Sequence, residues 1–163
     1  MTRPLQISVI GKGTPDDELS PLAEEVGRRL AEAGAVVVCG GLTGVMEAVA
    51  RGASAAGGRV IGIVPSSAAE EANPYCTHVV ASGVGHARNL AVVSSGEAVI
   101  AVGGEWGTLS EIAFARELGR PVVAIRSWEL SGSGALRGGP GVEVAADPAT
   151  AVERAIRLAS EER

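Results

Sequence analysis

Two kinds of apolar pattern alternate along the chain. Short, uninterrupted apolar runs are typical of strands that are buried on both faces. They predict strands at 7–10, 35–39, 59–64, 78–81, 98–102 and 121–125, with a shorter edge strand at 143–145. Between these runs apolar residues recur at helical spacing, and they predict helices at 19–33, 45–57, 84–95, 109–118 and 148–160. The alternation indicates an α/β fold: a doubly wound, Rossmann-like parallel sheet with helices on both faces, as a single domain over residues 1–163.

Glycine is concentrated where the predicted strands end. It accounts for 23 of the 163 residues, about twice the usual share of roughly 7%, and it clusters at 11–13, 40–44 and 103–107. In an open parallel sheet, ligands bind at the carboxyl ends of the strands, near the point where the strand order reverses. We therefore expect a ligand to approach the backbone at these turns. Longer loops are expected at 66–77 and 131–141.

Charge and cysteine content narrow the class of protein. The net charge is -5 and no stripe of Lys or Arg follows the chain, so we expect no nucleic-acid partner. No apolar run of about 18 residues is present to span a membrane, and residues 1–4 lead directly into the first strand, without a signal-peptide pattern. The two cysteines, Cys39 and Cys76, fit neither a disulfide framework nor a zinc site. We expect a cytoplasmic protein with reduced thiols, no bound metal and no resident cofactor.

The first glycine cluster does not match the common nucleotide-binding patterns. Gly11-Lys12-Gly13 lacks the third glycine of the dinucleotide fingerprint, and the second predicted strand ends in Cys39-Gly40-Gly41 instead of an acidic residue. Lys12 is not followed by the Ser or Thr of a Walker-type phosphate loop. It is the only lysine of the chain, and we expect it to be either a phosphate contact or simply an exposed side chain.

The third cluster, from Gly103 to Glu111, is a stronger candidate. Gly104 and Gly107 let the backbone approach an anion, amide groups at the start of the following helix favour phosphate, and Thr108 adds a hydroxyl donor. A second interpretation is open, because Thr108 and Glu111 have the spacing of a capping box that only closes the end of a helix. The position of the cluster at a strand end favours the ligand site.

This segment resembles a known family motif. The phosphate-binding motif PGGxGTxxE of the LONELY GUY family, cytokinin-activating phosphoribohydrolases also named lysine decarboxylases, is similar to Gly103-Gly104-Glu105-Trp106-Gly107-Thr108-Leu109-Ser110-Glu111. Gly103 replaces the family proline, and Glu105 replaces its second glycine, so that a carboxylate stands beside the phosphate position. Arg88 lies fifteen residues before Gly103, where the family has an arginine. The turn from Gly40 to Met46 is similar to an earlier glycine-rich turn of the family.

The resemblance covers residues 5–125, and the chain looks most similar to a shorter, bacterial branch. That branch also resembles molybdenum cofactor carrier proteins, which bind a phosphorylated pterin without catalysis. Two functions are implied: a phosphorylated, nucleotide-like ligand is bound and its N-glycosidic bond hydrolysed, as in a nucleoside 5′-monophosphate phosphoribohydrolase, or a phosphorylated pterin is only carried. A homo-oligomer, dimer or tetramer, is also implied. Pyridoxal-phosphate decarboxylation is rejected, because it needs a Schiff-base lysine and the only lysine is Lys12, in the first loop.

The resemblance also assigns roles to individual residues. Glu111 is the candidate catalytic carboxylate near the ribose C1′ atom, where it stabilises positive charge or activates water. Arg88 orients that carboxylate or the phosphate, or else is an ordinary surface arginine. Trp106 is either a stacking surface for a base or an apolar lid, and His86 and Asn89 either face the crevice or lie at the surface. The expected ligand-binding residues are Gly11, Lys12, Gly40, Gly41, Gly44, Gly103, Gly104, Trp106, Gly107 and Thr108.

Overall fold

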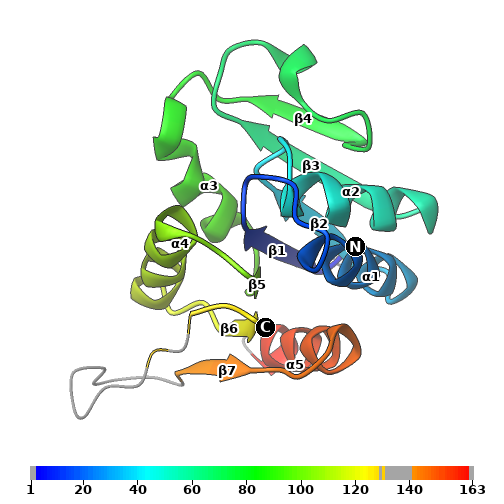
Figure 1. The fold of residues 1–163 in the computed structure, drawn as a ribbon, viewed down its shortest axis with the longest axis vertical. Helices are drawn as coiled ribbons and strands as arrows, with labels where there is room; N and C mark the ends of the chain where they lie inside the picture. The colour runs from blue at the N-terminus through cyan, green and yellow to red at the C-terminus, as the bar shows by residue number, and fades with distance from the viewer. Residues whose placement is uncertain (1–2, 129, 131–140, 162–163) are drawn as a thin grey trace.

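Seven parallel strands form one sheet in the order β4-β3-β2-β1-β5-β6-β7 (Figure 1). The computed structural model describes residues 3–128, 130 and 141–161. The strands are β1 (Gln6–Gly11), β2 (Val36–Cys39), β3 (Arg59–Val64), β4 (His78–Ala81), β5 (Ala98–Val102), β6 (Val122–Ile125) and β7 (Val142–Val144). The helices are α1 (Leu19–Glu32), α2 (Val45–Ala55), α3 (Arg88–Ser95), α4 (Trp106–Glu117) and α5 (Pro148–Glu161). The predicted Rossmann-like α/β fold is confirmed.

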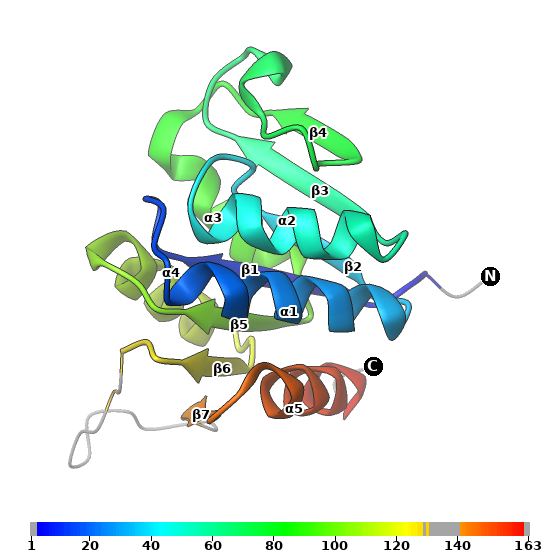
Figure 2. The same cartoon turned by 45° about the vertical axis from the view of Figure 1, so that its right-hand side comes forward.

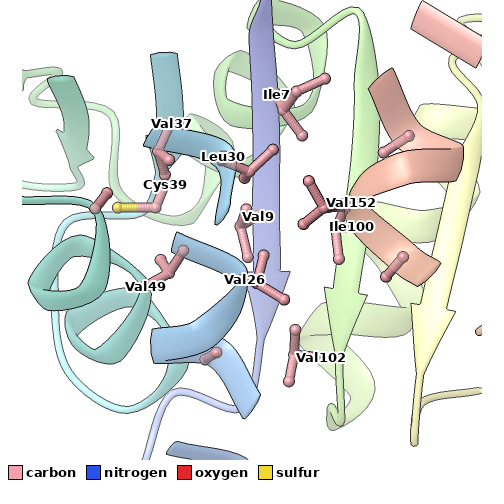
Figure 3. Close-up of a cluster of buried hydrophobic side chains, with 14 of the residues drawn as sticks. Ile7, Val9, Val26, Leu30, Val37, Cys39, Val49, Ile100, Val102 and Val152 are labelled. Carbon is pink, nitrogen blue, oxygen red and sulfur yellow. The ribbon is translucent and has the colours of Figure 1, made fainter. Parts of the chain in front are cut away.

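Helices cover both faces of the sheet. Ile7 and Val9 of β1 pack on the face that carries α1, α2 and α5, whereas Ile10 packs on the face that carries α3 and α4 (Figure 2). Figure 3 shows the first of these faces, with Val26 and Leu30 of α1 beside β1. Each fully buried aliphatic side chain of this size contributes about 1.5–3 kcal/mol through its removal from water. Burial on both faces explains why the strands are continuous apolar runs in the sequence.

The strand order reverses between β1 and β5. The chain places β2, β3 and β4 successively on one side of β1 and then returns, so that β5 pairs with the other side of β1. At the carboxyl ends of these two strands Gly11 lies opposite Val102. A Cβ atom on Gly11 would lie 2.2 Å from the Val102 carbonyl oxygen, so only glycine allows this approach. The switch point, where open parallel sheets bind ligands, is therefore next to the turn that begins at Gly103.

Several helix ends differ from the sequence prediction. Helix α4 begins at Trp106, three residues before the predicted start at Leu109. Helix α3 begins at Arg88, because residues 85–87 form a 3-10 turn, η2 (Gly85–Ala87), instead of the first helical turn predicted from residue 84. A second 3-10 turn, η1 (Ala69–Glu71), lies within the predicted long loop at 66–77. Helix α2 ends at Ala55, slightly before the predicted end at residue 57.

The C-terminal part agrees with its prediction where it is described. The edge strand is present as β7, one residue earlier than expected. Asp147 caps α5, since its Oδ1 atom accepts a 2.8 Å hydrogen bond from the Thr150 amide. The loop expected at 131–141 lies outside the described residues except for Gly141. In the described parts of the chain, every helix is too short or too polar to cross a bilayer.

Candidate functional site

A cavity of ≈ 320 Å³ opens at the carboxyl edge of the sheet, beside the switch point. Its size falls within the range of about 300–1,000 Å³ that is usual for small-molecule sites. Four segments that are distant in sequence line it: the end of β1, the turn between β2 and α2, the start of α3 and the start of α4. The polar and charged side chains among its lining residues are Thr43, His86, Arg88, Asn89, Glu105, Thr108 and Glu111.

Helix α4 begins at this cavity without a side-chain cap. Gly103 and Gly104 have φ angles of 59° and 136°, which turn the chain sharply from β5 into the helix. The first helical hydrogen bond of α4 runs from the Leu109 amide to the Glu105 carbonyl, over 3.0 Å. No described residue accepts a hydrogen bond from the amides of residues 106–108, which precede it. Such unpaired amides, with the positive end of the helix dipole, favour an anion.

The capping-box interpretation of Thr108 and Glu111 is wrong. Glu105, not Thr108, is the N-cap residue of α4, and Thr108 lies within the first turn of the helix. The reason is that the chain enters the helix through Gly104, which moves the start of the helix three residues earlier. Thr108 and Glu111 are both buried, with 3% and 8% of their surface exposed, and both line the cavity.

Arg88 is held inside the protein at the start of α3. Only 7% of its surface is exposed, so the surface-arginine alternative is wrong. One guanidinium nitrogen, Nη2, donates to the Gly40 carbonyl over 3.2 Å, and Nη1 donates to Asn89 Oδ1. The buried Nε atom has no hydrogen-bond partner among the described residues. Burial lowers the pKa of Arg88, and the Glu111 carboxylate opposes that shift. An arginine keeps its charge under such a shift, so a cation lines the cavity.

The close approach of Arg88 depends on Gly40. A Cβ atom at Gly40 would lie 2.8 Å from Arg88 Nη2 and 2.5 Å from the sulfur of Met46. Any larger residue at the end of β2 would therefore push the guanidinium group or Met46 out of place. This requirement gives the predicted site residue Gly40 a defined role in shaping the cavity.

Glu111 faces the same cavity from the second turn of α4. Burial raises the pKa of its carboxyl group to about 7, and the positive charge of Arg88 partly offsets the increase. The two side chains form no salt bridge. A carboxyl group with a pKa near neutrality exchanges protons readily at physiological pH, which suits a general acid or base.

The structure brings together a subset of the predicted site residues. Arg88, Glu111, Gly11, Gly40, Gly107 and Thr108 all line the cavity, as do His86 and Asn89. Gly41, Gly44, Gly103 and Gly104 are not among the lining residues, but their positive φ angles shape the two turns that bound it.

Lys12 and Trp106 do not line the cavity. The Nζ atom of Lys12 forms a 2.9 Å ion pair with Asp16 Oδ2, so the positive charge of the lysine is already balanced by a carboxylate. The Trp106 side chain is 76% exposed and lies against Trp128, with 5.2 Å between the ring centroids. Neither residue is part of the cavity lining, so any contact with a ligand requires the ligand to extend out of the cavity.

Some lining residues were not among the predicted ligand-binding residues. Leu42, Thr43 and Met46 contribute one wall, and the Thr43 hydroxyl joins this wall to the end of β1 by donating to the Gly13 carbonyl over 2.7 Å. Their position within or just after the glycine cluster at 40–44 was the sequence signal that could have identified them. Glu105 also lines the cavity and is exposed, so its carboxylate has access to water.

Comparison with known proteins identifies the family. A family model described as SLOG cluster4 matches residues 4–152. The chain belongs to the SLOG cluster4 family. SLOG denotes the LONELY GUY-like superfamily, so the resemblance of the segment 103–111 is confirmed at that level. A protein of Archaeoglobus fulgidus with no described function is 44% identical over 122 residues, which cover 75% of this chain and 80% of that protein.

Two solved structures are similar to this SLOG cluster4 chain over almost its whole length. The molybdenum cofactor binding protein from the phototrophic bacterium Rippkaea orientalis has a TM-score of 0.88 and 30% sequence identity, covering 97% of this chain and 99% of that chain. The molybdenum cofactor carrier protein from Chlamydomonas reinhardtii has a TM-score of 0.85 and 30% identity, with the same coverage.

Proposed function

We propose that the protein binds a phosphorylated nucleotide or nucleotide-like ligand in the cavity, with the phosphate at the start of α4. The observation that carries this proposal is the pairing of an uncapped helix start with a buried arginine. The amides of residues 106–108 have no acceptor among the described residues, and the charged guanidinium group of Arg88 belongs to the lining of the same cavity. Amides at a helix start and a forked guanidinium group are the two donors that phosphate binds best in proteins.

The remaining cavity suits the rest of such a ligand. Leu42, Met46 and the end of β1 provide apolar surface, while Asn89, His86 and Thr43 provide polar groups. A mostly apolar wall with a few placed polar groups is typical of small-molecule and cofactor sites. Glu105 lies at the exposed side of the cavity, where its carboxylate is able to turn toward water and away from the phosphate.

Two outcomes for the bound ligand are proposed, each from a different observation. Hydrolysis of the N-glycosidic bond of a nucleoside 5′-monophosphate is favoured by Glu111, since a carboxyl group with a pKa of about 7 is able to act on the ribose or on water. Non-catalytic carriage of the molybdenum cofactor or a similar phosphorylated pterin is favoured by the two solved relatives, which are named for binding or carrying that cofactor.

Titration calorimetry with AMP and with adenosine tests the shared part of the proposal. We expect AMP to bind and adenosine to bind much more weakly, because adenosine lacks the phosphate. Equal affinity for both compounds would contradict a phosphate site. Chromatography of AMP and cytokinin riboside monophosphates after incubation then separates the two outcomes. Free base that is released by the native protein and not by Glu111→Gln supports hydrolysis, whereas binding without release supports carriage.

A further inference from the structure

The two cysteines of the chain are neighbours in space. Cys39 ends β2, and Cys76 lies in the loop that precedes β4. Both are free thiols on the sheet face that carries α1 and α2, where they belong to one apolar cluster. The Cys39 thiol donates to the Met46 carbonyl over 3.8 Å, and the Cys76 thiol donates to Asn73 Oδ1 over 3.6 Å. The site described above uses neither thiol.

A glycine in the intervening strand makes this proximity possible. Cys39 pairs with Gly62 of β3 in the sheet. A Cβ atom at Gly62 would lie 2.5 Å from Cys76 Sγ, so the sulfur of Cys76 occupies the space that a side chain on β3 would fill. Because neighbouring strands are only about 4.8 Å apart, a sulfur over Gly62 lies next to the side chain of Cys39.

The two thiols differ in exposure and in pKa, so that Cys76 is the better nucleophile. Cys76 is partly exposed, whereas Cys39 is fully buried. The proximity of the Cys39 thiol lowers the pKa of Cys76. The same contact, together with burial, raises the pKa of Cys39. The accessible thiol is therefore the more readily ionised, and the thiolate is the form that reacts with oxidants.

The pair lies directly behind one wall of the cavity. Cys39 precedes Gly40, whose carbonyl accepts the hydrogen bond from Arg88. Asn73 joins the loop of Cys76 to that wall, since its amide donates to the Gly41 carbonyl over 2.8 Å and its Nδ2 atom donates to the Leu42 carbonyl over 2.9 Å. A covalent bond between the cysteines would thus tie β2 and the 66–77 loop together beneath the turn that shapes the cavity.

We propose that Cys76 and Cys39 form a peroxide-sensitive site that closes to an intramolecular disulfide. The Cys76 thiolate attacks one oxygen of hydrogen peroxide, the O–O bond breaks, and a sulfenic acid and one water form once the leaving hydroxide takes up a proton. The Cys39 sulfur then attacks the Cys76 sulfur and displaces a second water. Two thiols are oxidised and one peroxide is reduced to two waters. This inference does not rest on the identity of the ligand or on turnover in the cavity.

Intact-protein mass spectrometry after mild treatment with hydrogen peroxide tests the proposal, with Cys76→Ser and Cys39→Ser as matched variants. We expect the native protein to lose the mass of two hydrogen atoms and both titratable thiols, reversibly with dithiothreitol, and to remain a single chain on a non-reducing gel. Cys76→Ser should be inert, and Cys39→Ser should gain oxygen atoms at Cys76. Circular dichroism confirms that each variant is folded. Oxygen addition to the native protein without loss of two hydrogens would overturn the proposal, as would oxidation of Cys76→Ser at the native rate.

Discussion

Arg88 and Glu111 line one cavity from two different helices, α3 and α4, and their charges are not joined in a salt bridge. Both side chains are buried, so neither charge is fully solvated by water. Burial lowers the pKa of Arg88 and raises that of Glu111, which shows that each charge is costly where it stands. An anion bound beside Arg88 would offset that cost, and protonation of Glu111 would remove the remaining negative charge.

Removal of the Arg88 charge should weaken the binding of phosphorylated ligands. A hydrogen bond to a charged group contributes about 1.5–3 kcal/mol, so we expect Arg88→Gln to lower the affinity for AMP by roughly ten- to 150-fold. Arg88→Lys should retain part of the affinity for AMP, because lysine keeps the positive charge but lacks the planar, forked set of donors of the guanidinium group. Calorimetry measures both values. Lys12→Gln is the control, since Lys12 is already paired with Asp16 and should change the affinity far less. A larger effect at Lys12 than at Arg88 would move the phosphate to the first loop.

Glu111 should make the stability of the protein depend on pH. Its pKa rises from 4.5 to about 7 on folding, so between these values the folded state binds more protons than the unfolded state. The free energy of unfolding therefore falls as pH rises from about 4.5 to about 7. By pH 8 the loss amounts to about 3 kcal/mol.

Glu111→Gln removes this dependence. Urea unfolding should give similar stabilities for the two proteins near pH 4.5 and a more stable variant at pH 8. A difference between the two proteins that stays constant across this range would show that Glu111 ionises normally.

At the start of α4, alanine should be tolerated at Gly107 but should destabilise the protein at Gly104. Gly104 has a φ angle of 136°, and a Cβ atom there would lie 2.6 Å from the Thr108 side chain. We expect Gly104→Ala to destabilise the protein by about 1–3 kcal/mol and to displace Thr108 from the cavity. Gly107 lies in the first helical turn with nothing near an added Cβ atom, so Gly107→Ala should leave stability unchanged or raise it by up to about 1 kcal/mol. Equal unfolding midpoints for the two variants would contradict the geometry of this turn.

Helices α3 and α4 carry the apolar surface predicted to support a homo-oligomer. Leu90 of α3 is 44% exposed, and Phe114 and the C-cap residue Leu118 of α4 are 42% and 47% exposed. Light scattering should give a dimer or a larger assembly for the native protein, and Phe114→Glu should shift it toward the monomer. Leu130 is exposed at 38% outside these helices, and Leu130→Glu serves as the matched control. A native protein that is monomeric at micromolar concentration would contradict this prediction.

Much of the fold followed from the sequence because the strands are buried on both faces. The apolar runs located the six longer strands, and the glycine clusters located the binding edge. The start of α4 was not predictable, since the spacing of Thr108 and Glu111 satisfies a capping box as well as it does a ligand site. The structure shows that α4 begins at Trp106, after the positive φ angles at Gly103 and Gly104, which excludes a cap by Thr108.

Other features of the site depend on tertiary packing. Burial, which shifts the pKa of Glu111, comes from segments distant in sequence. The neighbourhood of Cys39 and Cys76 requires that β3 lie between them with glycine at position 62. Lys12 and Asp16 are four residues apart, a spacing that allows an ion pair. The sequence alone does not show whether the lysine pairs with this carboxylate or with a phosphate.

A crystal structure of the protein soaked with AMP would locate the bound phosphate. We expect the phosphate to lie within about 2.7–3.2 Å of the amide nitrogens of residues 106–108, with the guanidinium group of Arg88 beside the ligand. A phosphate bound at Lys12 or outside the cavity, with the start of α4 occupied only by water at saturating AMP, would contradict it.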